Sequence, residues 1–205
     1  MTQKYKLFNE DLPDNVNLKG DLAIDTEAMG LNNNRDRLCV VQIADEEGSV
    51  VLVKFGSQSD YSAPNLKALL EDKSREKILH FARFDVAIIM KYLNVDMRNI
   101  FCTKIASKFC RTYTDYHGLK TIASELLGVD LKKEKQSSDW GADELTQSQI
   151  NYAANDVIYL HSLRNALTTM LKREGRFQLA TNFMNFIPNV AKADLMMFGP
   201  DMFTH

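Results

Sequence analysis

The chain has 205 residues, enough for one domain with a full hydrophobic core, and its 45% hydrophobic and 25% charged residues are ordinary for a globular protein. Its formal net charge of −2 excludes the basic surplus with which proteins usually grip long nucleic acids. We therefore expect a small anionic substrate, or a local basic patch at one pocket, in place of a long duplex.

Three cysteines occur in the chain, Cys39, Cys102 and Cys110, without C-x-x-C spacing. This pattern predicts neither a disulfide framework nor a zinc site. No stretch has the apolar core of a signal peptide or the length of a membrane span. We expect a single domain over residues 1–205, located in the cytoplasm, with no membrane partner.

The first half of the chain contains three apolar runs typical of strands: Leu22–Glu27, Leu38–Ile43 and Val50–Val53. Short breaks separate them, so they predict an antiparallel meander. The break between the first two, Asn32–Arg37, consists of polar turn-forming residues and predicts a surface loop.

The middle of the chain predicts a strand followed by a helix. Leucines spaced i, i+3 and i+4 after Pro64 indicate a helix that ends near Lys73. A short strand is expected over Lys77–Phe81, and a helix over Phe84–Leu93. This order of elements is typical of a strand-to-helix unit.

The remainder of the chain is helical in pattern. We expect helices over Cys102–Arg111, over Leu119–Leu127 closed by Gly128, and over Gln147–Arg173, with a helical extension at 176–205. Strands early and helices late predict an α/β fold, with a mixed sheet flanked by helices.

The long helix over Gln147–Arg173 carries the strongest boundary signals. Thr146 and Gln149 form a capping-box pattern at its start. Basic residues and Gly175 supply the expected signals at its end.

The first predicted strand ends in two carboxylates separated by one residue, Asp25 and Glu27. Because side chains alternate between the two faces of a strand, both carboxylates point to one side and converge. Two anions this close repel each other, and a divalent cation between them, Mg²⁺ or Mn²⁺, makes the arrangement favourable. The alternative is two solvated acids on an edge strand, since so short a motif often arises by chance.

Three further side chains occupy positions suited to the same site. Asp85 stands where a predicted strand passes into a helix, a common place for a pocket, although it could simply favour the helix dipole. Tyr152 and Asp156 are four residues apart in a predicted helix and share one face. Asp156 lies in an apolar run, where a metal or a hydrogen-bond partner would offset the cost of its burial. Tyr152 alone could equally be a core aromatic with its hydroxyl at the rim.

These residues form three successive motifs: Asp25-x-Glu27, then Asp85, then Tyr152-x-x-x-Asp156. The order resembles the DEDDy 3′–5′ exonucleases, and the resemblance runs from about residue 22 to residue 160. It implies a ribonuclease H-like fold and two divalent cations, Mg²⁺ or Mn²⁺. It also implies that Asp25 binds both ions. Glu27 and Asp156 then complete the ligands of one ion, and Asp85 is a ligand of the other. Tyr152 then orients the attacking water, since a side chain with a pKa near 10 is a poor base at neutral pH.

Within that family the chain is most similar to the ribonuclease D branch, because Ser137-Ser138-Asp139-Trp140 precedes the third motif. Inside the branch it resembles the nanoRNase C-type diribonucleases of alphaproteobacteria. So short a chain leaves no room for the helicase-and-RNase-D C-terminal domain of ribonuclease D proper. The segments that carry the closer likeness are Arg35–Gln42, His80–Asp85, Cys102–Ser107 and Arg111–Lys120.

The residues after the carboxylate pair suggest how short RNA is selected. An apolar side chain at Met29-Gly30-Leu31 can wedge between two bases, and we favour Leu31, whose alternative is packing into the core beneath the loop. A donor for the 5′ phosphate is also needed, and the candidates are Arg83, His117, Lys135 and the hydroxyls of Ser137 and Ser138. The expected substrate-binding residues are Thr26, Met29, Gly30, Leu31, His80, Phe81, Arg83, Phe84, Lys135, Ser137, Ser138 and Trp140.

The sequence thus predicts a metal-dependent 3′–5′ exoribonuclease that cuts very short RNA, chiefly dinucleotides, into nucleoside 5′-monophosphates. One alternative is a general 3′ exonuclease that trims longer RNA or DNA. Another is a catalytically inactive binding module, which would have no need to retain four converging acids. The resemblance further implies a homo-oligomer, an octameric ring.

Overall fold

The computed structural model describes residues 5–131 and 138–198. Its centre is a six-stranded mixed sheet with strand order β1-β4-β3-β2-β5-β6. The strands are β1 (Tyr5–Asn9), β2 (Leu22–Ala28), β3 (Leu38–Ala44), β4 (Val50–Lys54), β5 (Lys77–Leu79) and β6 (Ile100–Cys102).

The predicted meander is confirmed. β2 pairs antiparallel with β3, and β3 with β4, while β2 and β5 run parallel. The residues of β3 and β4 are all buried, because helices cover both faces of the sheet here and leave no polar side to alternate with. β2 is therefore held on both sides, and its last residues carry Asp25 and Glu27 into the site.

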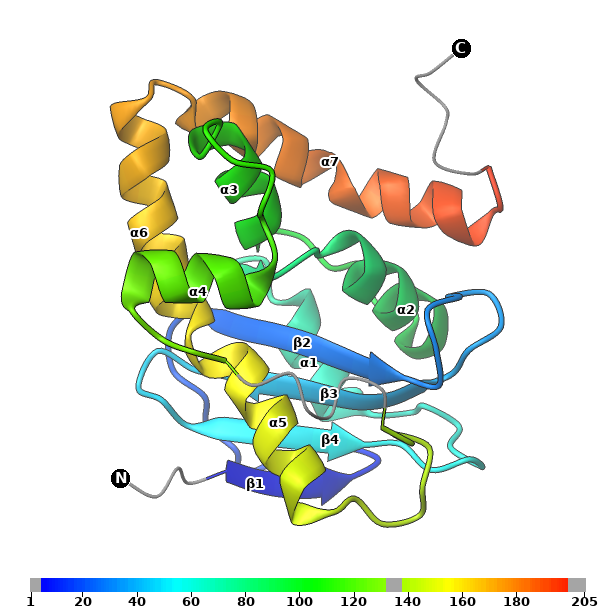
Figure 1. Cartoon of the computed structure of the whole chain (residues 1–205). Helices are drawn as coiled ribbons and strands as arrows, with labels where there is room; N and C mark the ends of the chain where they lie inside the picture. The colour runs from blue at the N-terminus through cyan, green and yellow to red at the C-terminus, as the bar shows by residue number, and fades with distance from the viewer. Residues whose placement is uncertain (1–4, 132–137, 199–205) are drawn as a thin grey trace.

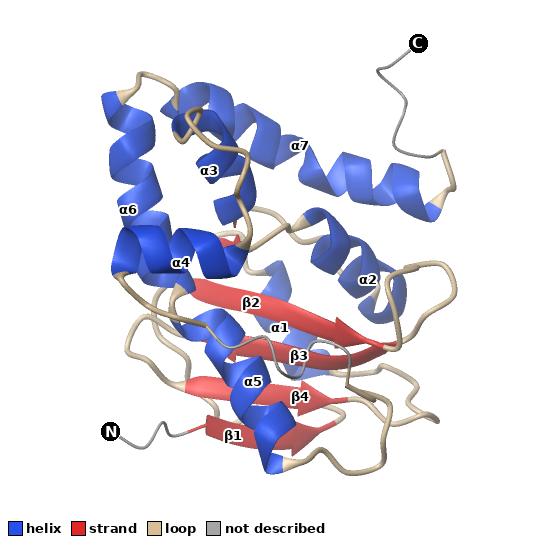
Figure 2. Ribbon diagram, in the orientation of Figure 1, coloured by secondary structure: helices blue, strands red, loops and turns tan. Residues whose placement is uncertain are grey.

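Helices lie on both sides of this sheet (Figure 1). In Figure 2, α5 crosses one face of β2, β3 and β4, and α1 lies behind the sheet. The predicted α/β architecture is therefore observed. The helices are α1 (Pro64–Glu71), α2 (Arg83–Leu93), α3 (Thr103–Cys110), α4 (Leu119–Leu127), α5 (Gln147–Ile158), α6 (Leu160–Arg173) and α7 (Phe177–Leu195).

The sequence analysis missed the two strands at the edges of the sheet. β1 pairs with β4 alone, and its side chains are mostly exposed, so it has no apolar alternation to recognise. β6 is only three residues long, and Cys102, where we expected a helix to begin, is its last residue. The helix that follows, α3, begins one residue later, at Thr103.

The single helix expected over Gln147–Arg173 is wrong, because the chain bends at Tyr159 and forms two helices. The Tyr159 N–H bonds the carbonyl of Val157, so the regular ladder of the helix stops there. The bend lets α5 pack on the sheet while α6 packs against α3 and α4 (Figure 1). The capping box of Thr146 and Gln149 is confirmed.

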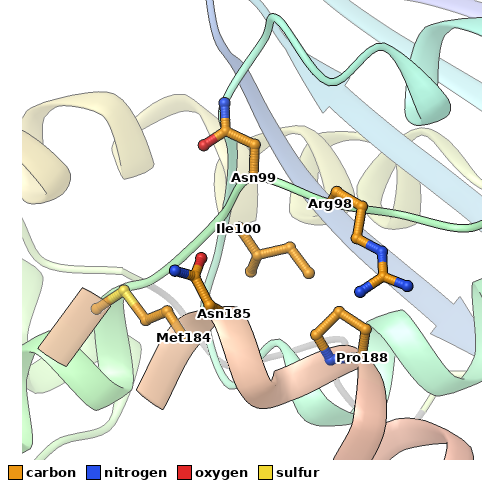
Figure 3. Close-up of a pocket in the computed structure, with 6 residues that line it drawn as sticks. All are labelled: Arg98, Asn99, Ile100, Met184, Asn185 and Pro188. Atoms are coloured by element: carbon orange, nitrogen blue, oxygen red, sulfur yellow. The ribbon is translucent and has the colours of Figure 1, made fainter. Parts of the chain in front are cut away.

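A second, smaller cavity lies away from the end of the sheet that carries Asp25 and Glu27. A small cavity of about 210 Å³ lies between α7 and the residues leading into β6, lined on the helix side by Met184, Asn185 and Pro188 (Figure 3). It contains no carboxylate.

Within residues 5–131 and 138–198, none of the helices combines the length and the apolar character needed to cross a lipid bilayer.

Candidate active site

Three carboxylates from two elements meet at the end of β2. Asp25 and Glu27 project from the same face of the strand, and Asp156 reaches them from α5, which packs across that face. One oxygen of each carboxylate lies within 4.8 Å of the other two. Alternation along the strand and packing of α5 therefore bring together acids that are more than a hundred residues apart.

Asp85 reaches this cluster from the first turn of α2. It is buried, and the hydroxyl of Thr26 donates a 2.7 Å hydrogen bond to its Oδ1. On the neighbouring strand, Gln42 donates a 3.0 Å hydrogen bond from Nε2 to Oδ2 of Asp25. These two donors fix the orientation of both carboxylates but leave their charges without any cationic partner among the described residues.

Burial raises the pKa values of all four acids, and repulsion between the carboxylates adds to the effect at Asp25 and Glu27. Burial raises the pKa of Asp25 well above its ordinary value, and the charges of Asp85, Asp156 and Glu27 raise it further. Burial, together with the charges of Asp156 and Asp85, raises the pKa of Glu27 to about 9. Desolvation raises the pKa values of Asp85 and Asp156 to about 7. Such a set of oxygen ligands fits a hard divalent cation, which would favour the ionised forms.

Tyr152 lies one turn before Asp156 in α5 and faces the same cluster. Burial, followed by the charges of Asp156 and Glu27, raises its pKa above the ordinary value, so the phenol keeps its proton at neutral pH. Its ring centroid lies 6.1 Å from that of the buried Trp140. Trp140 thus fixes the ring from the side, and the hydroxyl is left to act as a hydrogen-bond donor in the site.

The acids open into a cavity of about 800 Å³, which is within the range of small-ligand sites. β2, the loop after it, α2, α3, α4 and α5 all contribute to its wall. The lining residues are Asp25, Thr26, Glu27, Ala28, Met29, Gly30, Leu31, His80, Phe81, Phe84, Asp85, Lys104, Gly118, Leu119, Lys120, Thr121, Leu131, Ser138, Trp140, Tyr152 and Asp156.

A family model described as 3′–5′ exonuclease matches residues 5–172, which include every element that bears one of these acids. The chain belongs to the 3′–5′ exonuclease family. The expected ribonuclease H-like fold agrees with the solved structures that this exonuclease domain resembles.

The exonuclease domain has close relatives among solved structures. It is 46% identical to Brucella melitensis NrnC bound to pGG, with a TM-score of 0.94 and all of both chains covered. The same Brucella protein with bound Mg²⁺ gives 46% identity and a TM-score of 0.92 over 98% of each chain. The ribonuclease D of Gluconacetobacter diazotrophicus is 33% identical over 88% of this chain and 44% of its own length. This chain thus spans less than half the length of that curated relative.

In the exonuclease domain, the two candidate wedge residues, Met29 and Leu31, are exposed and line the cavity. Leu31 is 89% exposed, so the alternative that it packs into the core is wrong. Met29 and Phe81 are also exposed and line the same cavity. A Cβ at Gly30 would lie 2.3 Å from Oδ2 of Asp36, so a larger residue here would displace that carboxylate.

Arg83 does not line the cavity. Its Nε and Nη2 each donate a 2.6 Å hydrogen bond to the carboxylate of Asp194 in α7. The backbone carbonyl of Asp194 accepts a 3.2 Å hydrogen bond from Asn34, in the loop that follows Leu31. Arg83 is therefore linked to this loop through Asp194, and its ion pair lies outside the cavity lining.

The other predicted binding residues fall into three groups. His80, Phe84, Ser138 and Trp140 line the cavity. Thr26 also lines the cavity, but its hydroxyl donates a hydrogen bond to Asp85. His117, a candidate donor to the 5′ phosphate, does not line the cavity and forms a hydrogen bond with Ser107. Lys135 and Ser137 lie outside the described residues.

The structure adds two cations that the sequence analysis missed, Lys104 and Lys120, both in the cavity wall. Nζ of Lys104 lies 4.1 Å from the ring centroid of Phe81. Lys104 could have been found if Ile100–Cys102 had been recognised as a strand, because residues that follow neighbouring parallel strands gather at one edge of a sheet. No sequence signal pointed to Lys120.

Proposed function

We propose that this protein is a 3′–5′ exoribonuclease that degrades very short RNA, chiefly dinucleotides, to nucleoside 5′-monophosphates, as a single catalytic domain. One observation carries the proposal: four carboxylates and the exposed Leu31 line the same cavity of about 800 Å³. The acids would bind the cations needed for phosphodiester hydrolysis, and Leu31 would limit the length of the RNA that fits the cavity. The likeness to a Brucella nuclease bound to pGG supports a substrate of this size.

The acids suit two divalent cations, Mg²⁺ or Mn²⁺, because they are oxygen ligands whose charges no basic side chain of the described residues balances. When bound, such cations stabilise the charge that develops on the attacking and leaving oxygens. We assign Asp25 to both cations, Glu27 and Asp156 to one of them, and Asp85 to the other.

The remaining groups of the cavity position the substrate. The protonated hydroxyl of Tyr152 orients the attacking water by hydrogen bonding. Leu31 separates the two bases, while Phe81 offers an aromatic face backed by Lys104. Lys104 supplies positive charge that an anionic substrate needs and that the chain as a whole lacks. Lys120 also lines the cavity, but its Nζ lies 3.0 Å from Oδ1 of Asp130, which partly balances its charge.

Hydrolysis of labelled RNA of different lengths tests this function. We expect a dinucleotide to react at least about tenfold faster than a heptamer under matched, subsaturating conditions, with Mg²⁺ or Mn²⁺. Stacking on an apolar or aromatic wall contributes about 1–3 kcal/mol per base, and 1.4 kcal/mol corresponds to a tenfold change. Leu31→Ala should narrow the difference, because the short substrate loses its placement over the acids.

Leu31→Met is the matched control, since it keeps an apolar wedge, and Leu7→Ala removes a partly exposed leucine far from the cavity. Both should preserve the preference for dinucleotides. Equal rates on the dinucleotide and the heptamer would disprove this preference. The general exonuclease that trims longer RNA or DNA would then be the better description, as the ribonuclease D relatives suggest.

We also propose that the protein works in the cytoplasm as a homo-oligomer, an octameric ring. An exposed apolar stripe on α7 supports self-association: Leu179, Phe183 and Phe186 follow at helical spacing and are about half exposed. Light scattering should then give eight times the 23.4 kDa chain mass. Phe183→Asp should lower that mass, whereas Gln178→Glu on the same helix should not. A monomer mass for the unaltered protein would contradict the proposal.

A further inference from the structure

His80 stands at the level of the reacting acids. In the parallel pairing of β2 and β5, Ala23 is opposite Ile78. Asp25 and His80 each follow these partners by two residues, so they occupy equivalent positions at the same end of the sheet. His80 also lines the cavity that contains the acids. The nucleotide whose phosphate reacts would therefore place its sugar near this ring.

The hydrogen bonds of Thr103 fix which nitrogen of His80 carries the proton. The buried hydroxyl of Thr103 lies 2.9 Å from Nδ1 of His80 and donates to the carbonyl of Leu79 at 3.2 Å. A threonine hydroxyl has one proton, so both contacts are hydrogen bonds only if Nδ1–H of His80 is the donor. Nε2 is then left as an acceptor, and it has no hydrogen-bond partner among residues 5–131 and 138–198.

The ring also stays neutral. Burial lowers the pKa of His80 to about 3, and the positive charge of Lys104 acts in the same direction. An imidazole that does not titrate between pH 5 and 8 keeps Nε2 as an acceptor throughout that range. His80 is thus unlike Lys104 and Lys120, which only donate, and unlike the carboxylates, which are reserved for cations.

We propose that Nε2 of His80 accepts a hydrogen bond from the ribose 2′-hydroxyl of the nucleotide held over the acids, and that this contact favours RNA over DNA. The phosphodiester has no donor at neutral pH, so an acceptor must bind a hydroxyl or a base amine. The position of His80 beside Asp25 favours the sugar, since the bases stack further out on Leu31 and Phe81. Between nucleotides that carry the same base, the 2′-hydroxyl is the group that distinguishes RNA from DNA. This inference rests on the proposed function.

Binding measurements test the contact without requiring hydrolysis. The probes are a 5′-phosphorylated diguanosine RNA and versions that lack one 2′-hydroxyl or the terminal 3′-hydroxyl, each with Ca²⁺ present. The unaltered protein should prefer the full ribose form over the 2′-deoxy form by about tenfold, the value of one net hydrogen bond. His80→Phe should remove that preference, and His80→Gln, which can place an amide oxygen near the former Nε2, should restore part of it.

Three results would overturn the inference. The first is that His80→Phe weakens ribose and deoxyribose probes equally, so the ring has only a general structural role. The second is that only loss of the 3′-hydroxyl weakens binding. The third is a nitrogen NMR spectrum of the unaltered protein with the proton on Nε2 or with protonation of the ring near pH 6, a result that does not depend on any variant. A protein that binds no short RNA at all would instead contradict the proposed function.

Discussion

Asp25→Asn is expected to lower RNA hydrolysis by about 10³-fold or more, even at saturating Mg²⁺ or Mn²⁺. The change removes the negative charge of the ligand assigned to both cations, and charge stabilisation by such ions contributes several kcal/mol to catalysis. The amide keeps an oxygen that can still accept the hydrogen bond from Gln42. The fold should therefore survive, and near-normal turnover would contradict our assignment of the metal ligands.

The same variant is expected to be more stable than the unaltered protein when metal is absent. The cluster binds more protons in the folded state, since its pKa values are raised, so the free energy of unfolding falls as pH rises from about 4 through about 7 to about 9. Asp25→Asn removes one charge from this repulsion, so its advantage in EDTA should grow between pH 5 and pH 8.

Thermal melts at both pH values measure this difference. Asp143→Asn, which alters an exposed carboxylate outside the cavity, is the matched control and should melt like the unaltered protein. Saturating Mg²⁺ should stabilise the unaltered protein more than Asp25→Asn. A lower melting temperature for Asp25→Asn in EDTA at pH 8 would show that repulsion among the acids does not limit stability.

Tyr152→Phe is expected to slow hydrolysis by about 10²–10⁴-fold, the range for a positioned proton-transfer or orienting group, with little change in substrate affinity. The ring would keep its packing beside Trp140, so the loss isolates the hydroxyl. Because the pKa of Tyr152 is raised, the phenol acts as a protonated donor, and the rate of the unaltered enzyme should not rise in step with ionisation of a tyrosine.

Single-turnover rates separate this effect from product release. Tyr5→Phe is the matched control, because its hydroxyl bonds Asn151 of the same helix but lies outside the cavity. We expect a normal rate for that control. An unchanged single-turnover rate for Tyr152→Phe would exclude the orienting role.

Local geometry accounts for two pairs of the candidate residues, whereas their assembly into one site together with Asp85 was implied by the resemblance to the DEDDy exonucleases. Alternation along one strand puts Asp25 and Glu27 on the same face, and a four-residue spacing in α5 does the same for Tyr152 and Asp156. Both patterns are legible without knowing how the elements pack. The exposed position of Leu31 was only one of two alternatives, since local sequence does not say whether a loop covers an apolar residue.

The interactions that sequence reasoning missed are contacts between distant segments. Arg83 looked like a free cation beside the site, but its partner, Asp194, is 111 residues away. The predicted continuous helix was wrong at Tyr159 because packing of its two halves on different surfaces overrides local propensity. Lys104 was missed with the three-residue strand that precedes it.

The brace formed by Asp194 links the last turn of α7 to the loop that carries Leu31. Lys91 of α2 adds to it, donating hydrogen bonds of 2.9 Å and 2.8 Å to the carbonyls of Asn33 and Asn34. The loop that carries Leu31 is thus tied to α7 and α2, whereas the candidate acids come from β2, α2 and α5. Under the role that we propose for Leu31, we expect changes in α7 to alter which RNAs are accepted while the four acids keep their positions.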